Sequence, residues 1–462
     1  MKFSIVEIAT ITQLVLLSVS AHSVQKIPLY YQKRHHDHDF VTTGARELKN
    51  GMLGGLVEIG SPPQKFILAF DTSKGFTWVR TIDCKADNCQ GRCSFNPGLS
   101  TTYRDAHQLF TMDYGKGIVN TSLFLDTFKF GDIKVNQMPI GGAYLMNNFD
   151  QGFDGFLGLG RSVNLSNVAR YEKRSIPESG FVPIAYQQSS GVQSAQFGMY
   201  ITHQSGPGFS ENGSVFKEEM AYTTKSNVTQ QSTLTHEKSK PSSLMSSHST
   251  QDSKSTSKHQ VTTPGGYGNL AKRHYHKEAP AGYLIIGGVD HDAIEGKLHH
   301  IPLNNECGNS QDWAVPVRDA GFENNFHIHK HAKAILSTST DVIGLPNKQA
   351  EEFRKRWYAT YDEPDNTFMV PCCLMDQLSS FRIQLGDIQV TLPPHYWSHF
   401  RQTDSCCEMC RTNIGKSESE KNFILGSSFT NAFYTQYDSE KEQISLALKK
   451  NHIDDDLEIY QV

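Results

Sequence analysis

The sequence predicts a predominantly β protein of two lobes, with a cleft between them and a few short helices. Short strand-like runs alternate with Gly, Pro, Asn and Asp over about residues 51–200, and again over about residues 283–448. Each region contains an apolar strand that ends in a small polar turn and is followed much later by an apolar strand with glycine. The matching segments are FILAFDTSKGFTWV at 66–79 with GFLGLG at 155–160, and HAKAILSTSTDVIGL at 331–345 with FILGSSF at 423–429.

Residues 1–21 have the pattern of a secretory signal peptide. Lys2 precedes the apolar run IATITQLVLLSV, and Val19 and Ala21 stand where small residues precede a cleavage site. The run is too short for a comfortable membrane span, and no second long apolar stretch follows it. We therefore expect a secreted, extracellular product, with a buried N-terminal helix as the alternative. Residues 22–49, which include the dibasic pair Lys33-Arg34, are expected to be a short propeptide or a linker.

The nine cysteines of a secreted chain predict disulfide bonds. The odd number leaves at least one thiol free or bonded to another chain. Economical pairing joins cysteines within residues 84–93 and links Cys372 or Cys373 to Cys406, Cys407 or Cys410, with Cys307 apart from both groups. Four N-glycosylation sequons predict a glycoprotein, and they begin at Asn120, Asn164, Asn212 and Asn227.

Length and composition exclude several classes of protein. A chain of 462 residues has room for two or three domains, and 37% hydrophobic with 20% charged residues is typical of a globular protein. The net charge of −4 is close to neutral, and no block of like charge predicts nucleic acid or an anionic membrane as a partner. We expect a monomer.

Residues 204–279 differ in composition from both strand-rich regions. They are rich in Ser, Thr, Lys, Gln and His, and no Phe, Trp or Tyr occurs from 223 to 266. Such a segment buries too little apolar surface to offset the entropy of ordering, so we predict a disordered, partly O-glycosylated insertion that Lys272-Arg273 exposes to nicking. A spacer for wall anchoring or adhesion is the alternative. The expected N-terminal lobe is 50–190, the C-terminal lobe is 191–450 with this interruption, and 451–462 is an acidic tail.

Two local patterns make specific structural predictions. The segment NKQAEEFRKRWYATY at 347–361 has apolar residues at helical spacing, with Asn347 as its N-cap. The segment HIHKHAKAIL is expected to be a strand with His327, His329 and His331 on one face, because strand side chains alternate. Three such histidines are typical of a zinc or copper site, and solvated histidines on an edge strand are the alternative. We otherwise assign no metal or cofactor.

Seven motifs in order resemble the pepsin-like family of secreted eukaryotic aspartic proteases, over about residues 51–450 outside the insertion. They are LVEIGSPPQKFILAFDT at 56–72, Trp78 seven residues after Asp71, FNPGLSTTY at 95–103, MDYGKG at 112–117, FDGFLGLG at 153–160, GYLIIGGVDHDAIEGKLHHIPL at 282–303 and FILGSSFTNAFYTQYD at 423–438. The resemblance implies a pepsin-like double β-barrel in which each lobe supplies one catalytic loop. It also implies a flap containing Tyr114 and Gly115, with Trp78 beside it, and an extended peptide or protein as the partner.

The resemblance implies a catalytic pair in which this chain has lost one member. Enzymes of this family hydrolyse peptides with two nearby carboxylates that share a proton, one acting as base and the other as acid. Asp71 stands at the first position, whereas Ser337 replaces the aspartate at the second. A serine hydroxyl has too high a pKa to act as the base, and it cannot share a proton with Asp71. We therefore expect several kcal/mol of transition-state stabilisation to be lost.

The neighbours of both catalytic positions also depart from the family pattern. They are Thr72, Ser73 and Lys74 in the first loop, and Thr338, Ser339 and Thr340 in the second. Ser73 and Ser339 replace the glycine that lets the two loops approach each other closely. Lys74 replaces a serine that hydrogen-bonds the aspartate, and it either pairs with Asp71 or points into solvent. Asp341 is the one candidate for a substitute acid, although it is expected to lie nearer the peptide groove.

Three functional hypotheses follow from these residues. The favoured one is a catalytically impaired homologue, a pseudoprotease, that retains a peptide-binding cleft. The first alternative is an active aspartic endopeptidase that works at acid pH, and the second is a histidine-rich metal-binding protein. A product that has no remaining cleft function also fits the degenerate loops.

Overall fold

The computed structural model describes residues 24–31, 52–90, 92–114, 117–147, 153–162, 179–189, 191–202, 282–304, 312–399, 406–450, 452 and 456–462. One compact unit comprises Met1–Phe216 and Pro280–Val462, and the other, Lys217–Ala279, lies wholly outside the described ranges. The predicted signal peptide, the insertion, both dibasic pairs, Gly115, Cys307 and the three sequons after Asn120 also lie outside them.

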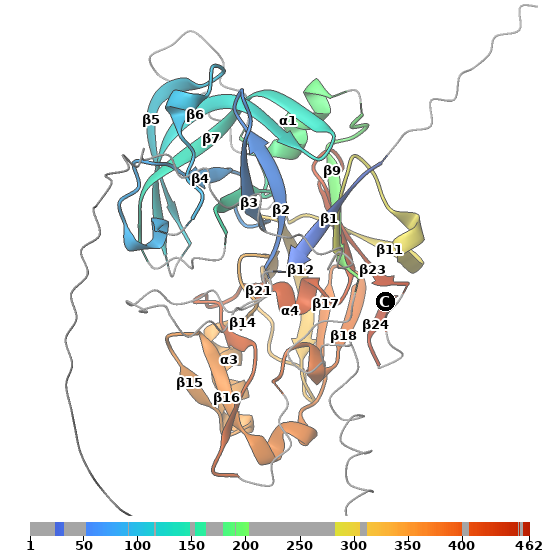
Figure 1. Ribbon diagram of the computed structural model, residues 1–462. Helices are drawn as coiled ribbons and strands as arrows, with labels where there is room; N and C mark the ends of the chain where they lie inside the picture. The colour runs from blue at the N-terminus through green and yellow to red at the C-terminus, as the bar shows by residue number, and fades with distance from the viewer. Residues whose placement is uncertain are drawn as a thin grey trace, which may run out of the picture. The chain divides into compact units, whose positions relative to one another are not determined.

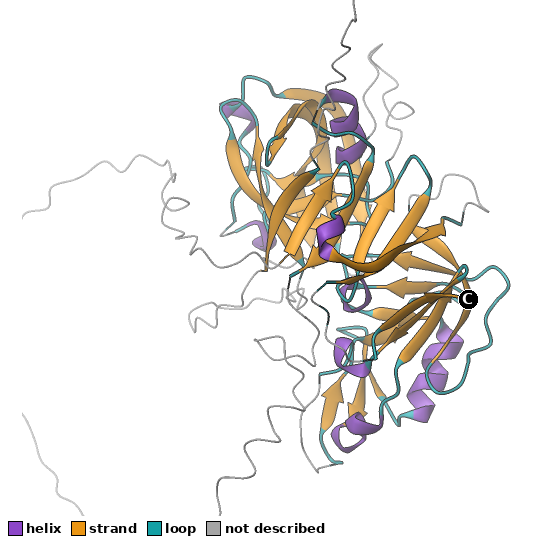
Figure 2. Cartoon of the chain, turned by 90° about the vertical axis from the view of Figure 1, so that its right-hand side faces the viewer, coloured by secondary structure: helices purple, strands orange, loops and turns teal. Residues whose placement is uncertain are grey.

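The described residues form a predominantly β structure with few helices, as predicted (Figures 1 and 2). Their largest sheet has thirteen strands, in the order β11 (Ile294–Pro302), β23 (Gln443–Lys449), β22 (Tyr434–Asp438), β9 (Gln196–Ile201), β10 (Gly282–Ile286), β1 (Gln25–Tyr31), β2 (Leu53–Ile59), β3 (Gln64–Asp71), β8 (Gly155–Gly158), β4 (Trp78–Arg80), β7 (Ile133–Asn147), β6 (Ile118–Phe130) and β5 (Arg104–Asp113).

Two further sheets belong to the second half of the chain. An eight-stranded sheet has the order β20 (Ile414–Lys416), β14 (Ile343–Leu345), β21 (Phe423–Leu425), β13 (Lys333–Leu336), β12 (Ala314–Gly321), β17 (Phe381–Leu385), β18 (Ile388–Leu392) and β24 (Glu458–Gln461). A three-stranded sheet contains β15 (Thr360–Asp362), β16 (Thr367–Pro371) and β19 (Met409–Arg411). The α-helices described are α1 (Phe181–Gln188), α3 (Asn347–Arg356) and α4 (Ser427–Thr430). Short 3-10 turns are Asp87–Cys89, Pro97–Leu99, His291–Ala293, Cys372–Gln377 and Pro394–Tyr396.

The strands form where apolar and polar residues alternate in the sequence, or where several apolar residues follow one another. In β6, the sequence IVNTSLFLDTFKF buries alternate side chains such as Val119, Thr121 and Leu123, because successive residues of a strand face opposite sides. The run FILAFD of β3 has neighbours on both sides and is almost wholly buried. Aromatic rings complete the core of the first lobe, where Phe95 stacks on Phe124 with ring centres 4.9 Å apart.

The predicted internal duplication is present in the strand pairing. In the first lobe β3 runs parallel to β8 and places Asp71 opposite Gly158, while in the second β13 runs parallel to β21 and ends beside Leu425. A Cβ atom on Gly158 would lie 2.4 Å from the Phe76 nitrogen, and one on Gly426 would lie 2.5 Å from the Val342 oxygen. The glycine in each apolar segment therefore allows the backbone of its catalytic loop to pass closely.

Strand β1 comes from the segment expected to be a propeptide or a linker. It pairs antiparallel with β10 over Gln25–Leu29 and contacts β2 through its last two residues, so it connects the strands of the two lobes (Figure 1). The Lys26 ammonium lies 2.7 Å from an Asp290 carboxylate oxygen and 4.4 Å from the centre of the Tyr283 ring. Burial alone would lower the pKa of Lys26, but the hydrogen bonds and charges of Asp290 and Tyr200 together outweigh burial and raise it.

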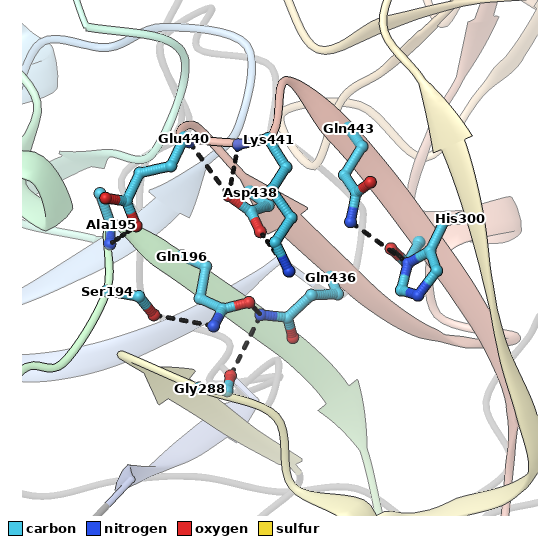
Figure 3. A network of polar contacts seen from close by, with 11 residues as sticks. Ser194, Ala195, Gln196, Gly288, His300, Gln436, Asp438, Glu440, Lys441 and Gln443 are labelled. Carbon is cyan, nitrogen blue, oxygen red and sulfur yellow. Dashed lines mark hydrogen bonds and ion pairs between the residues drawn. The ribbon is translucent and has the colours of Figure 1, made fainter. Parts of the chain in front are cut away.

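Side-chain amides join strands β22 and β9, which lie beyond β10 from β1 in the same sheet (Figure 3). The Gln436 side chain of β22 donates to the Gln196 side chain of β9 and to the Gly288 carbonyl, each at 3.1 Å. The turn between β22 and β23 is held by Asp438, whose carboxylate accepts from the backbone N–H groups of Glu440 and Lys441. These contacts satisfy polar groups in a sheet that is mostly buried.

Helix α3 is present, but both of its ends differ from the prediction. Pro346, not Asn347, is the N-cap residue, and the helix stops at Arg356 because Tyr358 adopts a left-handed conformation with φ 51°. The Ala359 N–H then donates to the Arg354 carbonyl, which is the six-to-one hydrogen bond of a Schellman motif. The remaining residues of the pattern turn back and begin β15.

We predict that Tyr358→Gly raises the free energy of unfolding by about 0.5–1 kcal/mol. The Cβ atom destabilises a left-handed residue, and that gain exceeds the added freedom of glycine in the unfolded chain. The Tyr358 side chain is 77% exposed, so little packing is lost. Urea unfolding of both proteins measures the difference, and Tyr358→Val should lower stability. Equal stability of all three proteins would contradict the assigned role of this residue.

The predicted strand that placed three histidines on one face is wrong. Strand β13 begins only at Lys333, and the Ala332 N–H donates to the His329 carbonyl, which closes a turn before the strand. The alternation that the metal-site hypothesis required is therefore missing for His327, His329 and His331. Within the described residues, no group of three or more His, Cys, Asp or Glu side chains is arranged to hold a metal ion.

Three disulfide bonds follow the predicted pairing ranges. Cys84 bonds Cys89 within the first lobe, while Cys372–Cys410 and Cys373–Cys406 join the turn after β16 to the segment containing β19. In the parts of the chain that are described, no helix has the length and apolar character needed to cross a membrane.

Candidate active site

The two catalytic positions lie at the ends of equivalent strands. Asp71 is the last residue of β3, and the Leu159 N–H donates to its carbonyl oxygen. Ser337 directly follows β13, and its own N–H donates to the Leu425 carbonyl. Both side chains are buried, Asp71 completely. The two residues therefore occupy equivalent places in the two lobes.

Two threonines lock the catalytic loops together. The Thr72 N–H donates to Thr338 Oγ1 and the Thr338 N–H donates to Thr72 Oγ1, both at 3.1 Å. Each hydroxyl also donates across to the opposite strand: Thr72 to the Leu336 carbonyl at 3.1 Å and Thr338 to the Phe70 carbonyl at 2.7 Å. Four buried hydrogen bonds thus join the lobes, so serine at positions 73 and 339 does not hold the loops apart.

A row of serine hydroxyls connects the two catalytic positions. Ser73 donates both its N–H, at 2.8 Å, and its hydroxyl, at 2.5 Å, to Asp71 Oδ1. Ser73 Oγ lies 3.1 Å from Ser339 Oγ, which in turn lies 2.9 Å from Ser337 Oγ. Since each hydroxyl has one proton, the row is satisfied when Ser337 donates to Ser339, Ser339 to Ser73, and Ser73 to the carboxylate. The two side chains that replace glycine therefore lie between Asp71 and Ser337.

The Asp71 carboxyl is a single ionisable group in a dry environment. Burial raises its pKa to about 6, even though the hydrogen bonds from Ser73 and the charge of Lys74 act to lower it. Its Oδ2 atom is buried and accepts no hydrogen bond from the described residues. The site therefore has one carboxyl that titrates near pH 6 and no second carboxyl on the hydroxyl row.

Lys74 lies toward the flap. Its ammonium is 5.9 Å from the centre of the Tyr114 ring, and its charge favours the ionised form of Asp71. No ion pair joins it to Asp71 in the part of the chain that the structure describes. Lys74 therefore acts on Asp71 through the electric field of its charge. This is intermediate between the two alternatives from the sequence, which were an ion pair with Asp71 and a side chain that points into solvent.

Asp341, the candidate substitute acid, is engaged elsewhere. Its carboxylate lies 3.6 Å from the Arg411 guanidinium, which also pairs with Asp365 at 2.8 Å. The Ser427 N–H donates to the Thr340 carbonyl and holds the backbone of this loop against α4. A carboxylate paired with arginine is a poor proton donor, so the geometry does not favour replacement of the lost aspartate by Asp341.

The flap residues Tyr114 and Trp78 contact each other. The Trp78 indole N–H donates to the Tyr114 hydroxyl at 2.9 Å, and Phe156 lies edge-on to the Tyr114 ring with centres 5.4 Å apart. Trp78 is fully buried at the start of β4, in an apolar cluster with Phe76 and Met112. Burial and the nearby charge of Asp71 raise the pKa of Tyr114 well above its ordinary value.

Paired strand-end loops, the threonine lock and the flap contact define the scaffold of an aspartic-protease type of site. The family model for eukaryotic aspartyl protease matches residues 54–261 and 269–449, and the chain belongs to this family. It is similar to human gastricsin, with 20% identity over 404 residues that cover 85% of this chain and 80% of the relative. Dog pepsin B is 23% identical, with 85% and 80% covered, and sheep pregnancy-associated glycoprotein 1 is 22% identical, with 87% and 83% covered.

Sequence reasoning named the loop threonines without their role and missed Arg411. The sequence did contain a signal for the hydrogen bonds between the loops, because a threonine directly follows each catalytic position. Duplicated segments place such equivalent residues face to face. Arg411 has no comparable signal, because it lies far from Asp341 in sequence and reaches it only through the three-stranded sheet.

Proposed function

We propose that this protein is a secreted pepsin-like homologue that binds an extended peptide and has lost, or nearly lost, the ability to cleave it. The observation that carries the proposal is the row of serine hydroxyls from Asp71 through Ser73 and Ser339 to Ser337. It fills the space between the two catalytic positions with side chains and leaves one carboxyl where the chemistry needs two.

One carboxyl cannot perform both halves of the reaction. Attack by water on a peptide bond requires a base for the water proton and an acid for the carbonyl oxygen, in one transition state. Asp71 can act as the base or as the acid but not as both, and the hydroxyl of Ser337 has too high a pKa to act as the second group. The alternative of an active acid endopeptidase therefore requires a second acid, and the described contacts of Asp341 speak against the nearest candidate.

Retained contacts around the site support a binding role. The threonine lock holds the two loops together and the Trp78–Tyr114 hydrogen bond holds the flap tyrosine in place, which is the arrangement that a bound peptide needs. In this account an extended peptide lies under the flap and pairs its backbone with loop and flap residues, as a strand added to a sheet edge does. The protein acts as a monomer outside the cell, without nucleic acid or membrane as partner.

The test combines binding and cleavage in one sample. Fluorescein-labelled haemoglobin-derived peptides of about ten residues are titrated with the full chain, and their masses are measured after incubation at acid pH. We expect saturable binding with dissociation constants on the order of 1–100 μM and intact peptides. Tyr114→Ala should weaken binding at least about tenfold, roughly 1.4 kcal/mol, since it removes the flap contact.

A matched control is available in Tyr186, which is exposed on helix α1. Tyr186→Ala removes the same side-chain atoms as Tyr114→Ala without touching the flap or the catalytic loops, so binding should not change. Absence of binding in the unaltered protein, or equal weakening by both substitutions, would contradict a peptide-binding site under the flap. Cleaved peptides whose appearance depends on Asp71 would favour the endopeptidase instead.

A further inference from the structure

Strands β5 and β6, which form the flap hairpin, and the neighbouring strand β7 expose several apolar side chains on one face, called here the outer face of the flap hairpin. Leu109 on β5 is 69% exposed, Leu145 on β7 is 52% exposed and Ile118 on β6 is 37% exposed. The three strands are neighbours at one end of the thirteen-stranded sheet, where β5 is the edge strand (Figure 1). An exposed apolar edge of this kind promotes association between sheets unless something covers it.

Asn120 lies in the middle of this outer face. It pairs with Thr111 on β5 and with Leu145 on β7, so all three side chains point to the same side of the sheet. Ile118 and Ser122 are two residues away on the same strand and therefore share this side, and Leu109 pairs directly with Ser122. Side chains that are directly or diagonally opposite across strands lie within about 8 Å of each other. The three apolar residues thus surround Asn120.

The side-chain amide of Asn120 is oriented for modification. Its Oδ1 accepts a hydrogen bond of 2.8 Å from the Thr111 hydroxyl, at an exposed position. Its Nδ2, the atom that bonds to sugar, makes no hydrogen bond to the described residues, and the Asn120 side chain is partly accessible to solvent. Asn120-Thr121-Ser122 is a glycosylation sequon, and Thr121 at its centre is buried on the other side of the strand.

We propose that Asn120 carries an N-linked glycan, and that the glycan covers Leu109, Ile118 and Leu145 on the outer face of the flap hairpin. The donor is an oligosaccharide linked to a lipid pyrophosphate. The bond between the sugar C1 atom and the pyrophosphate oxygen breaks, a C1–Nδ2 bond forms, Nδ2 loses one proton, and the lipid pyrophosphate leaves with the electron pair. Neither partner is oxidised or reduced.

A glycan fits this surface in chemistry as well as in position. The CH groups on one side of a sugar ring pack on aliphatic side chains, while its hydroxyl groups remain in water. A bulky polar chain rooted on the second strand also obstructs the approach of another sheet to the β5 edge. The glycan therefore prevents association of two protein molecules through the β5 edge, and it does so without touching the catalytic loops. It rests on the proposed export of the chain, because the lipid-linked donor is in the secretory pathway.

The site test uses the full chain expressed in eukaryotic cells, in one arm with its own N-terminus and in another behind an established secretory leader. The purified protein is treated with peptide-N-glycosidase in heavy-oxygen water, which marks each formerly glycosylated asparagine as labelled aspartate. We expect label at residue 120 in both arms. An unlabelled Asn120 peptide in the second arm would overturn the proposed site. Label in the second arm with no export in the first would instead contradict secretion and leave the site standing.

The covering role is tested with a matched pair of substitutions two residues downstream. Ser122→Ala destroys the sequon, whereas Ser122→Thr preserves it, and neither changes Asn120. We expect the alanine variant to bind an apolar dye at least about twofold more strongly than the threonine variant and to elute partly as larger species. Adding Leu109→Ser and Leu145→Ser to the alanine variant should restore the behaviour of the threonine variant. Equal dye binding and elution for the glycosylated and sugar-free proteins would overturn the covering role.

Discussion

The triple variant Ser73→Gly, Ser337→Asp, Ser339→Gly is expected to gain peptide-cleaving activity at acid pH, by at least about 100-fold over the unaltered protein. The substitution at 337 supplies the second carboxyl, and the two glycines remove the hydroxymethyl groups that lie between the catalytic positions. A water molecule then has room between two carboxyls that can share a proton. The threonine lock, which positions both loops, is unchanged.

The single variant Ser337→Asp is expected to remain near the level of the unaltered protein. Its new carboxyl would meet the Ser339 hydroxyl first, and the row to Asp71 would persist without space for the attacking water. Initial rates on a denatured protein substrate measure both variants. The control for shape is Ser73→Gly, Ser337→Asn, Ser339→Gly, which lacks only the charge and should be silent. Full activity of Ser337→Asp alone would show that the serine row does not obstruct the site.

The second large effect concerns stability and its dependence on pH. Asp71 has a pKa raised to about 6 in the folded protein from 3.8 in an unperturbed chain. The folded state therefore holds a proton that the unfolded chain has already lost between these values, and stability falls as pH rises through them. The difference of about two pKa units corresponds to about 3 kcal/mol. This stabilisation is full below about pH 4 and absent above the folded pKa.

Asp71→Asn should abolish this loss, because the amide resembles the protonated carboxyl and does not ionise. At about neutral pH the variant is expected to be more stable than the unaltered protein by about 3 kcal/mol, and near pH 4 the advantage should vanish. Urea unfolding at several pH values measures the trend. Asp132→Asn, in the exposed turn between β6 and β7, is the control and should follow the unaltered protein. A constant difference across pH would contradict a buried, titrating Asp71.

The fold was predictable because its signals are local. Alternating or wholly apolar runs such as those of β6 and β3 specify strands, and the repeated unit around Asp71 and Ser337 specifies two equivalent lobes. The assignment of Asp71 and Ser337 as the catalytic positions comes from the resemblance to the family motifs and stays a prediction, while the structure places both residues at the ends of equivalent strands. The loss of one carboxyl is visible in the sequence itself, since no packing arrangement changes serine into an acid.

Other features depend on contacts that no local pattern reveals. The meeting of Ser73 with Ser339 requires two loops, each set by its own parallel strand pair, to face one another. Helix α3 ends early because Tyr358 takes a left-handed conformation, which an aromatic residue rarely does, so the apolar spacing beyond it was misleading. The histidines before β13 fall in a turn although their spacing fits a strand. In each case the tertiary environment outweighs the local pattern.

The most direct test of the account is digestion of denatured haemoglobin by the purified protein across about pH 3 to 6, beside Asp71→Asn. A site with one carboxyl and a serine row predicts no cleavage above background by either protein at any pH in this range. Cleavage by the unaltered protein that disappears in Asp71→Asn would contradict the central claim. It would mean that a second acid reaches Asp71 and completes the catalytic pair.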